Sequence, residues 1–485
     1  MPESRIAVVH YHLRPGGVTG VISRTVRALR DDFSFAVLSG EPPSAAEGVG
    51  CPVAIVEGLG YHEDPDPGTG RGLVARLRES AEAALGGRPD IWHFHNHSLG
   101  KNPALGEVIS ILAGDGERLL LHIHDFAEDG RSENYRSLLR HVGGDPRRLS
   151  RLLYPVADHI HYGTINSRDH AALVRAGIPM RQVHLVHNPV EITSGEEAAS
   201  ADRTGRRRRF LYPSRAIRRK NIGELLLWAS LAQDAQFAVT MAPLNPAQRP
   251  IYDGWVAFAR AHRLPVEFEV GGGSRSLGAL LKNSDAVITT SLAEGFGLAF
   301  VEPALVGRPI VGRDLPEVTD GLAQLGVVMT GLYNRLNVPI EWIGGDRFHR
   351  AIGRGLALAR RRFNRDTTET DVDVAVAAAR QGDMVDFGRL DEPMQESVIL
   401  RILGTPGEGA RISPGSLMPG PVWGDAVADN RKVIAQKLSS AAYAERLRRA
   451  YRDLLAAQIS NPSELEGDAV LNEFLDPARF ILIMT

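Results

Sequence analysis

The sequence lacks the marks of a disulfide-bonded, membrane-spanning or nucleic-acid-binding chain. Its single cysteine, Cys51, has no partner for an internal disulfide and belongs to no CxxC motif for a metal or a redox reaction. No apolar run reaches the roughly 18 residues that span a bilayer. The 56 Lys and Arg nearly cancel the 58 Asp and Glu, so no overall field attracts nucleic acid. Any charged binding surface must therefore be local.

The N-terminal residues also lack a secretory signal. Met1 to Arg5 lead directly into the short apolar run Ile6–Val9, without a long hydrophobic region or a small-residue cleavage site. We therefore expect a cytoplasmic protein. The basic run Arg206–Arg209 could meet an anionic membrane, but four arginines between two domains fit a solvated hinge better. The sequence does not indicate an oligomeric state.

What the sequence does have is a regular alternation of short apolar runs and amphipathic stretches. At 485 residues the chain exceeds the about 250 to 300 that one core supports, so two domains are expected. Such alternation predicts parallel sheets covered by helices, which is the α/β class. In the first domain the expected strands are Ile6–His10, Phe35–Leu38, Val53–Val56, Ile91–His95, Leu119–His124, His159–Thr164 and Val183–Val186.

A second series of strands follows a break in this pattern. We predict an N-terminal domain at 1–190, a linker at 191–209 that loses apolar periodicity, and a C-terminal domain at 210–440. The second domain carries an insertion near 334–421 with only scattered helical periodicity. Residues 441–485 are expected to form a helical tail that packs on the first domain. The strands expected in the second domain are Phe210–Ser214, Phe237–Met241, Val266–Val270, Ala286–Thr290 and Pro309–Val311.

The most informative stretch is Ser291–Glu302, where an expected strand ends, a glycine-containing loop turns and a helix begins. Gly295 and Gly297 let the backbone approach a ligand closely, and the N–H groups of the helix's first turn favour an anion such as a phosphate. Glu294 and Glu302 can each accept hydrogen bonds from a pair of neighbouring hydroxyls, as sugars supply. The alternative is an ordinary strand-turn-helix in which Glu294 favours the helix dipole. The combination of features favours a functional site.

This stretch resembles the signature of the retaining glycosyltransferases of family 4 and of their relatives, the glycogen and sucrose synthases. That signature is a Glu, seven residues that include Gly-Phe-Gly, and a second Glu. The resemblance implies the GT-B fold, in which two Rossmann-like, doubly wound domains face each other and a C-terminal helix crosses back to the first. The N-terminal domain would then be the acceptor side, and the C-terminal domain would bind the nucleotide sugar. It implies that Glu294 contacts hydroxyls of the transferred hexose and that Glu302 binds the ribose of the nucleotide. The amides of Phe296, Gly297 and Leu298 would line the phosphate and the sugar of the donor.

A second motif, Ser214–Asn221, stands at the end of the second domain's first strand. Arg215 and Lys220 can converge on one phosphate group, the former with its planar fork and the latter as a point charge. Alone, such a cluster is as often a solvated loop. The resemblance implies that both bind the pyrophosphate of the donor. Arg218 and Arg219 are interpreted as solvated.

A third motif follows the first strand. In Arg14–Gly20 the neighbouring residues Gly16 and Gly17 allow an anion or a sugar to approach the start of a helix. A glycine turn at such a junction is common without a ligand, and the segment is no GxGxxG fingerprint. The resemblance places Gly16 and Gly17 near the diphosphate and the acceptor.

Histidines are concentrated in the first domain, and their alternate spacing on strands puts them on shared faces. A zinc site is imaginable, but we interpret most of them as packing residues because no cysteine accompanies them. His124 differs, since it closes the fifth strand where the family has a histidine that approaches the donor sugar. Its expected role is hydrogen bonding and orientation. His97 lines either the acceptor side or an ordinary strand end. The histidines in question are His93, His95, His97, His122, His124, His159 and His161.

The expected reaction is transfer of a hexose from a nucleotide diphosphate sugar to a hydroxyl acceptor. The resemblance implies front-face displacement with retention, in which Arg215, Lys220 and helix amides stabilise the leaving diphosphate. No metal or other cofactor is then required, and no DxD-like motif is evident. The alternatives are a glycoside phosphorylase on the same fold, in which Glu302 would lose its ribose partner, and a non-catalytic sugar-nucleotide-binding protein.

Overall fold

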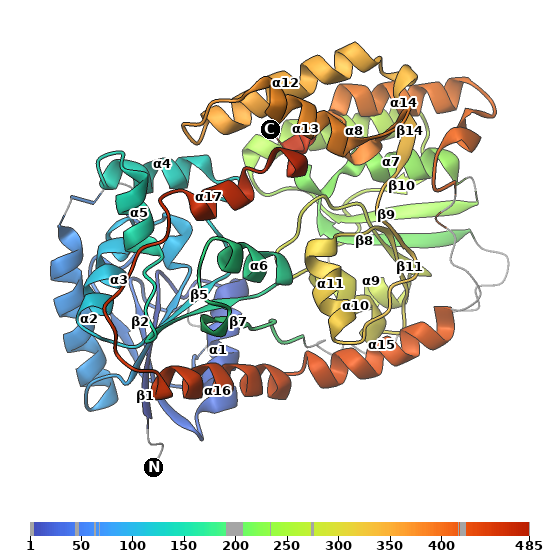
Figure 1. Ribbon diagram of the computed structural model, residues 1–485. Helices are drawn as coiled ribbons and strands as arrows, with labels where there is room; N and C mark the ends of the chain where they lie inside the picture. Colours follow the sequence, from blue (N-terminus) through green and yellow to red (C-terminus); the bar gives the residue numbers. More distant parts are fainter. Residues whose placement is uncertain are drawn as a thin grey trace. The chain divides into compact units, whose positions relative to one another are not determined.

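The computed structural model describes residues 4–43, 48–62, 65–66, 68–190, 207–232, 234–272, 276–415, 417 and 423–484 (Figure 1). The chain divides into two compact units. The first contains Met1–Pro189 and Leu438–Leu475, and the second contains Val190–Lys437 and Asp476–Thr485. Most of the predicted linker, 191–206, lies outside the described residues. No helix in the described part of the chain is both long and apolar enough to cross a bilayer.

The first unit is built on one parallel sheet with the strand order β3-β2-β1-β4-β5-β6-β7. This is the doubly wound order, in which the direction of strand addition reverses between β1 and β4. All seven expected strands are present. They are β1 (Ser4–His10), β2 (Phe33–Ser39), β3 (Val53–Ile55), β4 (Ile91–His95), β5 (Leu119–Ile123), β6 (Ile160–Thr164) and β7 (Val183–Leu185). The helices that alternate with them are α1 (Gly17–Leu29), α2 (Thr69–Leu85), α3 (Ala104–Gly114), α4 (Ser132–His141), α5 (Pro146–Leu153) and α6 (Ser167–Arg175).

A helix from near the end of the chain completes the first unit's core. α16 (Ser440–Ala456) buries Tyr443, Leu447, Tyr451 and Leu454 in the same apolar cluster as the inner face of α1. Two tyrosine hydroxyls in this layer are paired, that of Tyr443 with Thr25 Oγ1 at 2.6 Å and that of Tyr451 with His93 Nδ1 at 2.8 Å. A short helix, α17 (Ala469–Phe474), also belongs to this unit.

The second unit repeats the doubly wound pattern in a parallel sheet with the order β10-β9-β8-β11-β12-β13. The direction of addition here reverses between β8 and β11. Its strands are β8 (Arg208–Arg215), β9 (Ala235–Met241), β10 (Val266–Glu267), β11 (Ala286–Thr289), β12 (Ile310–Arg313) and β13 (Leu332–Tyr333). Its first helices are α7 (Ile222–Leu231), α8 (Arg249–Ala261), α9 (Leu277–Lys282), α10 (Leu298–Leu305) and α11 (Pro316–Gln324).

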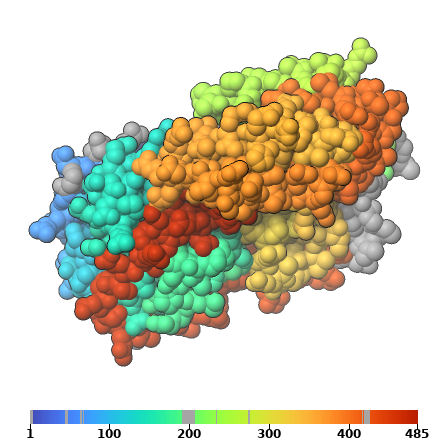
Figure 2. Space-filling view, turned by 45° about the horizontal axis from the view of Figure 1, so that its top comes forward, coloured from blue at the N-terminus to red at the C-terminus, as the bar shows by residue number. Residues whose placement is uncertain are grey.

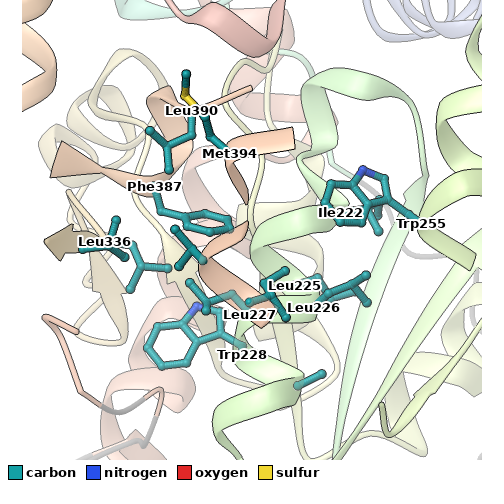
Figure 3. Close-up of a cluster of buried hydrophobic side chains, with 14 of the residues drawn as sticks. Ile222, Leu225, Leu226, Leu227, Trp228, Trp255, Leu336, Phe387, Leu390 and Met394 are labelled. Carbon is teal, nitrogen blue, oxygen red and sulfur yellow. The ribbon is translucent and has the colours of Figure 1, made fainter. Parts of the chain in front are cut away.

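The segment 334–421 is more regular than the sequence predicts. It forms α12 (Gly345–Arg361), α13 (Glu369–Ala379), α14 (Glu392–Gly404) and a small antiparallel sheet of β14 (Asn337–Pro339), β16 (Met384–Asp386) and β15 (Arg380–Gln381). Its side chains Leu336, Phe387 and Leu390 share one buried cluster with α7 (Figure 3). In the space-filling view the segment, coloured orange, forms a large part of the visible surface of the second unit (Figure 2). The segment is therefore a structural part of this unit's core.

The C-terminal region agrees with the expected tail at its start and differs from it at its end. Near the expected boundary at 441, α15 (Trp423–Lys437) ends the second unit's part of the chain and α16 begins in the first unit, because Ser439 accepts a hydrogen bond from Ala442 N and starts a new helix. The last residues, Asp476–Thr485, belong to the second unit and not to the first. There Leu482 is buried in the cluster around α7, and Arg389 donates a hydrogen bond to the carbonyl of Phe480. The 334–421 segment thus helps to bury the apolar end of the chain and donates a hydrogen bond to its backbone.

Candidate active site

The second unit's candidate site lies at the carboxyl ends of β8 and β11, where the strand order reverses. Doubly wound sheets bind ligands at this position, because the loops on either side diverge there. The loop after β11 ends at Gly297, which has the left-handed backbone conformation (φ 77°) and starts α10 without a side-chain cap. A Cβ there would lie 2.6 Å from Val318 Cγ1. Glycine is therefore required for α10 to begin at this point.

Glu294 and Lys220 form an ion pair at this reversal point. Each side chain is only about 10% exposed, so each charge lowers the cost of burying the other. Ser291 Oγ donates a second hydrogen bond to Glu294 Oε1 at 2.7 Å. Burial lowers the pKa of Lys220 even though Glu294 opposes that shift. The pair joins the two loops that the sequence predicted to carry function.

The turn at Lys220 and Asn221 is held by a buried polar network. The Lys220 carbonyl accepts hydrogen bonds from Tyr212 OH and Thr290 Oγ1, both at 2.9 Å. Asn221 has the left-handed conformation (φ 50°), and its side chain donates to Glu224 Oε2 at 2.8 Å and accepts from Gln395 Nε2 at 2.9 Å. The backbone that presents Lys220 is therefore fixed from several sides.

Arg313 extends this network with two buried ion pairs. Its guanidinium donates to Glu224 Oε2 at 2.6 Å and to Asp386 Oδ1 at 2.8 Å, and all three residues are at most 5% exposed. The two carboxylates hold the pKa of Arg313 well above its ordinary value. Tyr333 OH donates to Glu224 Oε1 at 2.7 Å. The 334–421 segment thus supports the Lys220 turn through Asp386 and Gln395, which no sequence motif indicates.

Glu302 occupies the second turn of α10 and differs from Glu294 in having no partner. In the described part of the chain no hydrogen-bond donor reaches its carboxylate, and burial raises its pKa. Partial burial of a carboxylate without a hydrogen-bond donor raises the free energy of the folded protein, and a hydrogen bond from a ligand hydroxyl would lower it.

The cations of the second motif take different positions. Arg215 is exposed at the end of β8, after a β-bulge, and makes no ion pair with a described carboxylate. Arg218, interpreted from sequence as solvated, is instead held by Glu392 of α14, with hydrogen bonds of 2.6 and 2.8 Å. Arg219, interpreted from sequence as solvated, has a buried Nε with no partner in the described chain. Its neighbour is Lys220, so Arg219 is a further cation available to an anionic ligand.

The other predicted site residues lie in the first unit. Gly16 and Gly17 precede α1, and a Cβ at Gly17 would meet no atom within 4 Å while one at Gly16 would meet only the Arg14 carbonyl at 3.9 Å. Packing inside this unit therefore does not explain why both are glycine.

His124 directly follows β5 and is 8% exposed. Its ring nitrogen lies 2.9 Å from His95 Nδ1, and burial lowers its pKa to about 3. The ring is neutral at physiological pH, which suits hydrogen bonding. His97, in contrast, is fully buried and bonded to the Leu153 carbonyl, so it lines no acceptor surface.

Four histidines form a compact array across β4 and β5. His93 Nε2 lies 3.2 Å from His122 Nδ1, and His95 pairs with His124. One nitrogen each of His93, His95 and His122 lie within 4.8 Å of one another, close enough for a metal ion. The Nε2 atoms of His95 and His122 are buried without a partner in the described chain. Burial lowers the pKa of every ring in this array, so all four are neutral.

Known proteins with a similar sequence or structure agree with the arrangement of two doubly wound sheets described above. No family model matches the chain. It is 26% identical over 345 residues to mannosylglucosyl-3-phosphoglycerate synthase of Petrotoga mobilis, a match that covers 65% of this chain and 66% of that protein. Among solved structures it is similar to HepE of Anabaena in complex with UDP and glucose (TM-score 0.51, 15% identity, 93% and 100% of the two chains). It is likewise similar to sucrose-phosphate synthase of Thermosynechococcus elongatus (TM-score 0.53, 16% identity, 94% and 100%).

The chain has the GT-B fold. Its two doubly wound sheets and the glycosyltransferase structures that it resembles agree on this point, as the sequence predicted. The match to the synthase spans slightly less than two thirds of that protein's length.

Proposed function

We propose that the protein is a retaining glycosyltransferase that moves a hexose from a nucleotide diphosphate sugar to a hydroxyl acceptor without a metal ion. The observation that carries the proposal is the arrangement at the reversal point of the second sheet. There the Lys220–Glu294 pair lies beside the start of α10, and Glu302 stands without a partner on the same helix. The structures of HepE were solved with UDP and glucose or with UDP-glucose, which makes a nucleotide sugar the first donor to test.

The charges at this site suit a diphosphate. The site has three cationic side chains but only one carboxylate paired with any of them. The cations are Arg215, Arg219 and Lys220, and the carboxylate is Glu294, which pairs with Lys220. A bound diphosphate would take Lys220 as its partner and release Glu294 to accept hydrogen bonds from the hexose. The N–H groups at the start of α10 would add a positive field at the same phosphate.

Glu302 has the chemistry to bind a ribose. Its unpaired, partly buried carboxylate can accept hydrogen bonds from both hydroxyls of a vicinal pair. A glycoside phosphorylase would use inorganic phosphate and would leave Glu302 without this partner. The unpaired carboxylate therefore favours a nucleotide-dependent reaction.

The proposed chemistry is front-face displacement. The bond from the anomeric carbon to the leaving phosphate oxygen breaks, the acceptor oxygen bonds to the same face, and the acceptor's proton passes to the leaving phosphate. Arg215 and Lys220 stabilise the departing diphosphate, and Glu294 stabilises the positively charged hexose. For His124 of the first unit, neutral because of its burial, the proposed role is hydrogen bonding to a sugar and not removal of a proton.

Slow hydrolysis of UDP-, GDP- and ADP-sugars, followed by mass spectrometry, tests the proposal without knowledge of the acceptor. We expect one donor to release its diphosphate, and the anomer first formed, read by proton NMR, to retain the donor's configuration. An inverted product would refute retention. Release of glucose 1-phosphate from a glucoside and inorganic phosphate, with no donor hydrolysis, would support the phosphorylase instead.

A further inference from the structure

The carboxyl ends of the first unit's strands carry a group of charged and aromatic side chains that the proposed donor site does not use. In the order of the sheet, Tyr61 follows β3, Glu41 follows β2, Arg14 follows β1 and Lys101 follows β4. Asp125 and Arg131 come after β5. We call these six residues the strand-end cluster. It surrounds the point between β1 and β4 where this sheet reverses, which is where doubly wound sheets bind ligands.

Tyr61 is the centre of the cluster and is 44% exposed. Its hydroxyl lies 3.0 Å from His12 Nε2, and its ring packs edge-on against that of Tyr11. Two cations stand near its ring centroid, Lys101 Nζ at 5.7 Å and Arg14 Cζ at 6.0 Å. An exposed ring that is held by neighbours on several sides keeps its position before a ligand arrives.

The loop that carries Tyr61 is fastened to the turn that carries Lys101. Asn102 Nδ2 donates to the carbonyls of Gly58 and Gly60, at 2.8 Å each, and His62 N donates to the Lys101 carbonyl at 2.8 Å. A Cβ at Gly40 would lie 2.1 Å from Gly60 N, so the loop also rests directly on the end of β2. Tyr61 and Lys101 therefore form one preorganised surface.

The charges of the strand-end cluster do not balance. Arg14 is bound by Glu41 at 2.6 Å, and Arg131 forms an ion pair with Asp125. In the chain that the structure describes, Lys101 has no carboxylate within ion-pair distance. The six residues of the cluster thus include three cations and two carboxylates, and Lys101 is the cation that neither carboxylate pairs with. One anionic group from a ligand would complete the set.

We propose that the acceptor expected on the first domain is a sugar or glycoside with a phosphate or carboxylate group, and that the strand-end cluster binds it. The anionic group pairs with Lys101, and Tyr61 OH and the His12 ring bind hydroxyls, because each can donate or accept a hydrogen bond. This inference rests on the proposed function, since only a transferase requires an acceptor.

The test is a set of binding titrations by ligand-detected NMR with the full chain. The probes are glucose 6-phosphate and glucuronate, with neutral glucose and methyl glucoside as their uncharged counterparts. We expect the charged sugars to bind more tightly than the neutral ones. Lys101→Met should reduce the affinity for the charged sugars on the order of ten-fold and leave that for the neutral ones unchanged. Lys101→Arg should restore most of the loss.

Lys432→Met is the matched control, because Lys432 is an exposed lysine of α15 in the second unit. Any of three results would overturn the inference. Charged and neutral sugars could bind with the same affinity, the charged sugars could fail to bind, or Lys101→Met could leave the affinity for the charged sugars unchanged. Titration of UDP and GDP into the same samples separates the two proposals. If the nucleotides bind but Lys101 gives no preference for charged over neutral sugars, only the proposed acceptor class is refuted. If the charged sugars bind but neither nucleotide does, the proposed donor is refuted.

Discussion

Gln395 Nε2 donates a hydrogen bond to the side-chain oxygen of Asn221, 2.9 Å away, although the two residues are 174 positions apart in the sequence. Asn221 directly follows Lys220, and both carbonyls of this turn also accept hydrogen bonds from Thr290. The 334–421 segment therefore holds the side chain of the residue that follows Lys220. Gln395 is a positioning residue in this arrangement, since it acts through Asn221.

Gln395→Ala should lower the affinity for UDP or GDP by roughly five- to ten-fold, because one buried hydrogen bond at the Lys220 turn is lost. In the Lys220→Ala background the same substitution should cost almost nothing, since the group that it positions is absent. Calorimetric titration of the four proteins measures this coupling. Ser397→Ala, on the exposed side of the same helix, is the control. Equal losses in both backgrounds would show that Gln395 supports only the general stability of the unit.

Glu294→Gln and Glu302→Gln should affect different kinetic constants. Glu294 meets the hexose as positive charge develops, so its loss should lower the turnover number by about 10²- to 10³-fold and barely change nucleotide affinity. Glu302 holds the ribose before and during the reaction alike, so its loss should weaken nucleotide binding by about 1.5 to 3 kcal/mol. Steady-state rates and calorimetry separate the two effects. Normal nucleotide affinity in an inactive Glu302→Gln variant would contradict the ribose assignment.

Activity should persist in excess chelator, because Arg215, Lys220 and the start of α10 already supply positive charge at the diphosphate. The measurement is turnover before and after chelation, with the metal content of the protein determined in parallel. Loss of activity that magnesium or manganese restores would refute a metal-free mechanism. If the purified protein contained one zinc ion per chain and His122→Asn removed it, the histidine array of β4 and β5 would be a metal site.

Acid should destabilise the first unit before the second. Burial lowers the pKa of His93 and His124 to about 3 and that of His10 to about 4, from an ordinary value of 6.5. At a pH between the lowered pKa and 6.5, each of these histidines is protonated in the unfolded chain but not in the folded one. The free energy of unfolding therefore falls as the pH drops below 6.5, by about 1.4 kcal/mol per pH unit for each such histidine.

Hydrogen exchange of β4 and β5 amides at pH 7 and pH 5 checks this slope. His93→Leu should reduce the dependence on pH, even if it also lowers stability at neutral pH, because one proton-binding group is removed. Replacement of the exposed His62 by Leu should leave the slope unchanged. Equal protection of these strands at both pH values would contradict the prediction.

Local patterns in the sequence predicted most of the strands and both loops at the second sheet's reversal point, because each depends on neighbouring residues. The ion pair of Lys220 with Glu294 was not predicted, although both residues were chosen. The partners Asp386, Gln395 and Glu392 were missed because they lie in a segment whose sequence shows no motif. One signal was available. Arg313 ends an apolar strand, and a buried arginine requires a buried carboxylate.

The last residues join a different unit from the expected one for a related reason. An apolar run such as Phe480–Met484 does not indicate which of two cores it joins. That choice depends on groups distant in sequence, here the side chain of Arg389 and the cluster around α7.

The order in which the ribosome makes this chain has a consequence for its folding. The first unit's core needs Tyr443, Leu447, Tyr451 and Leu454 of α16, so it stays incomplete through the synthesis of more than two hundred intervening residues. The second unit in turn needs Leu482. Release of the nascent chain at Lys437 would leave both units with an uncovered apolar face, and such a fragment should require a chaperone or aggregate.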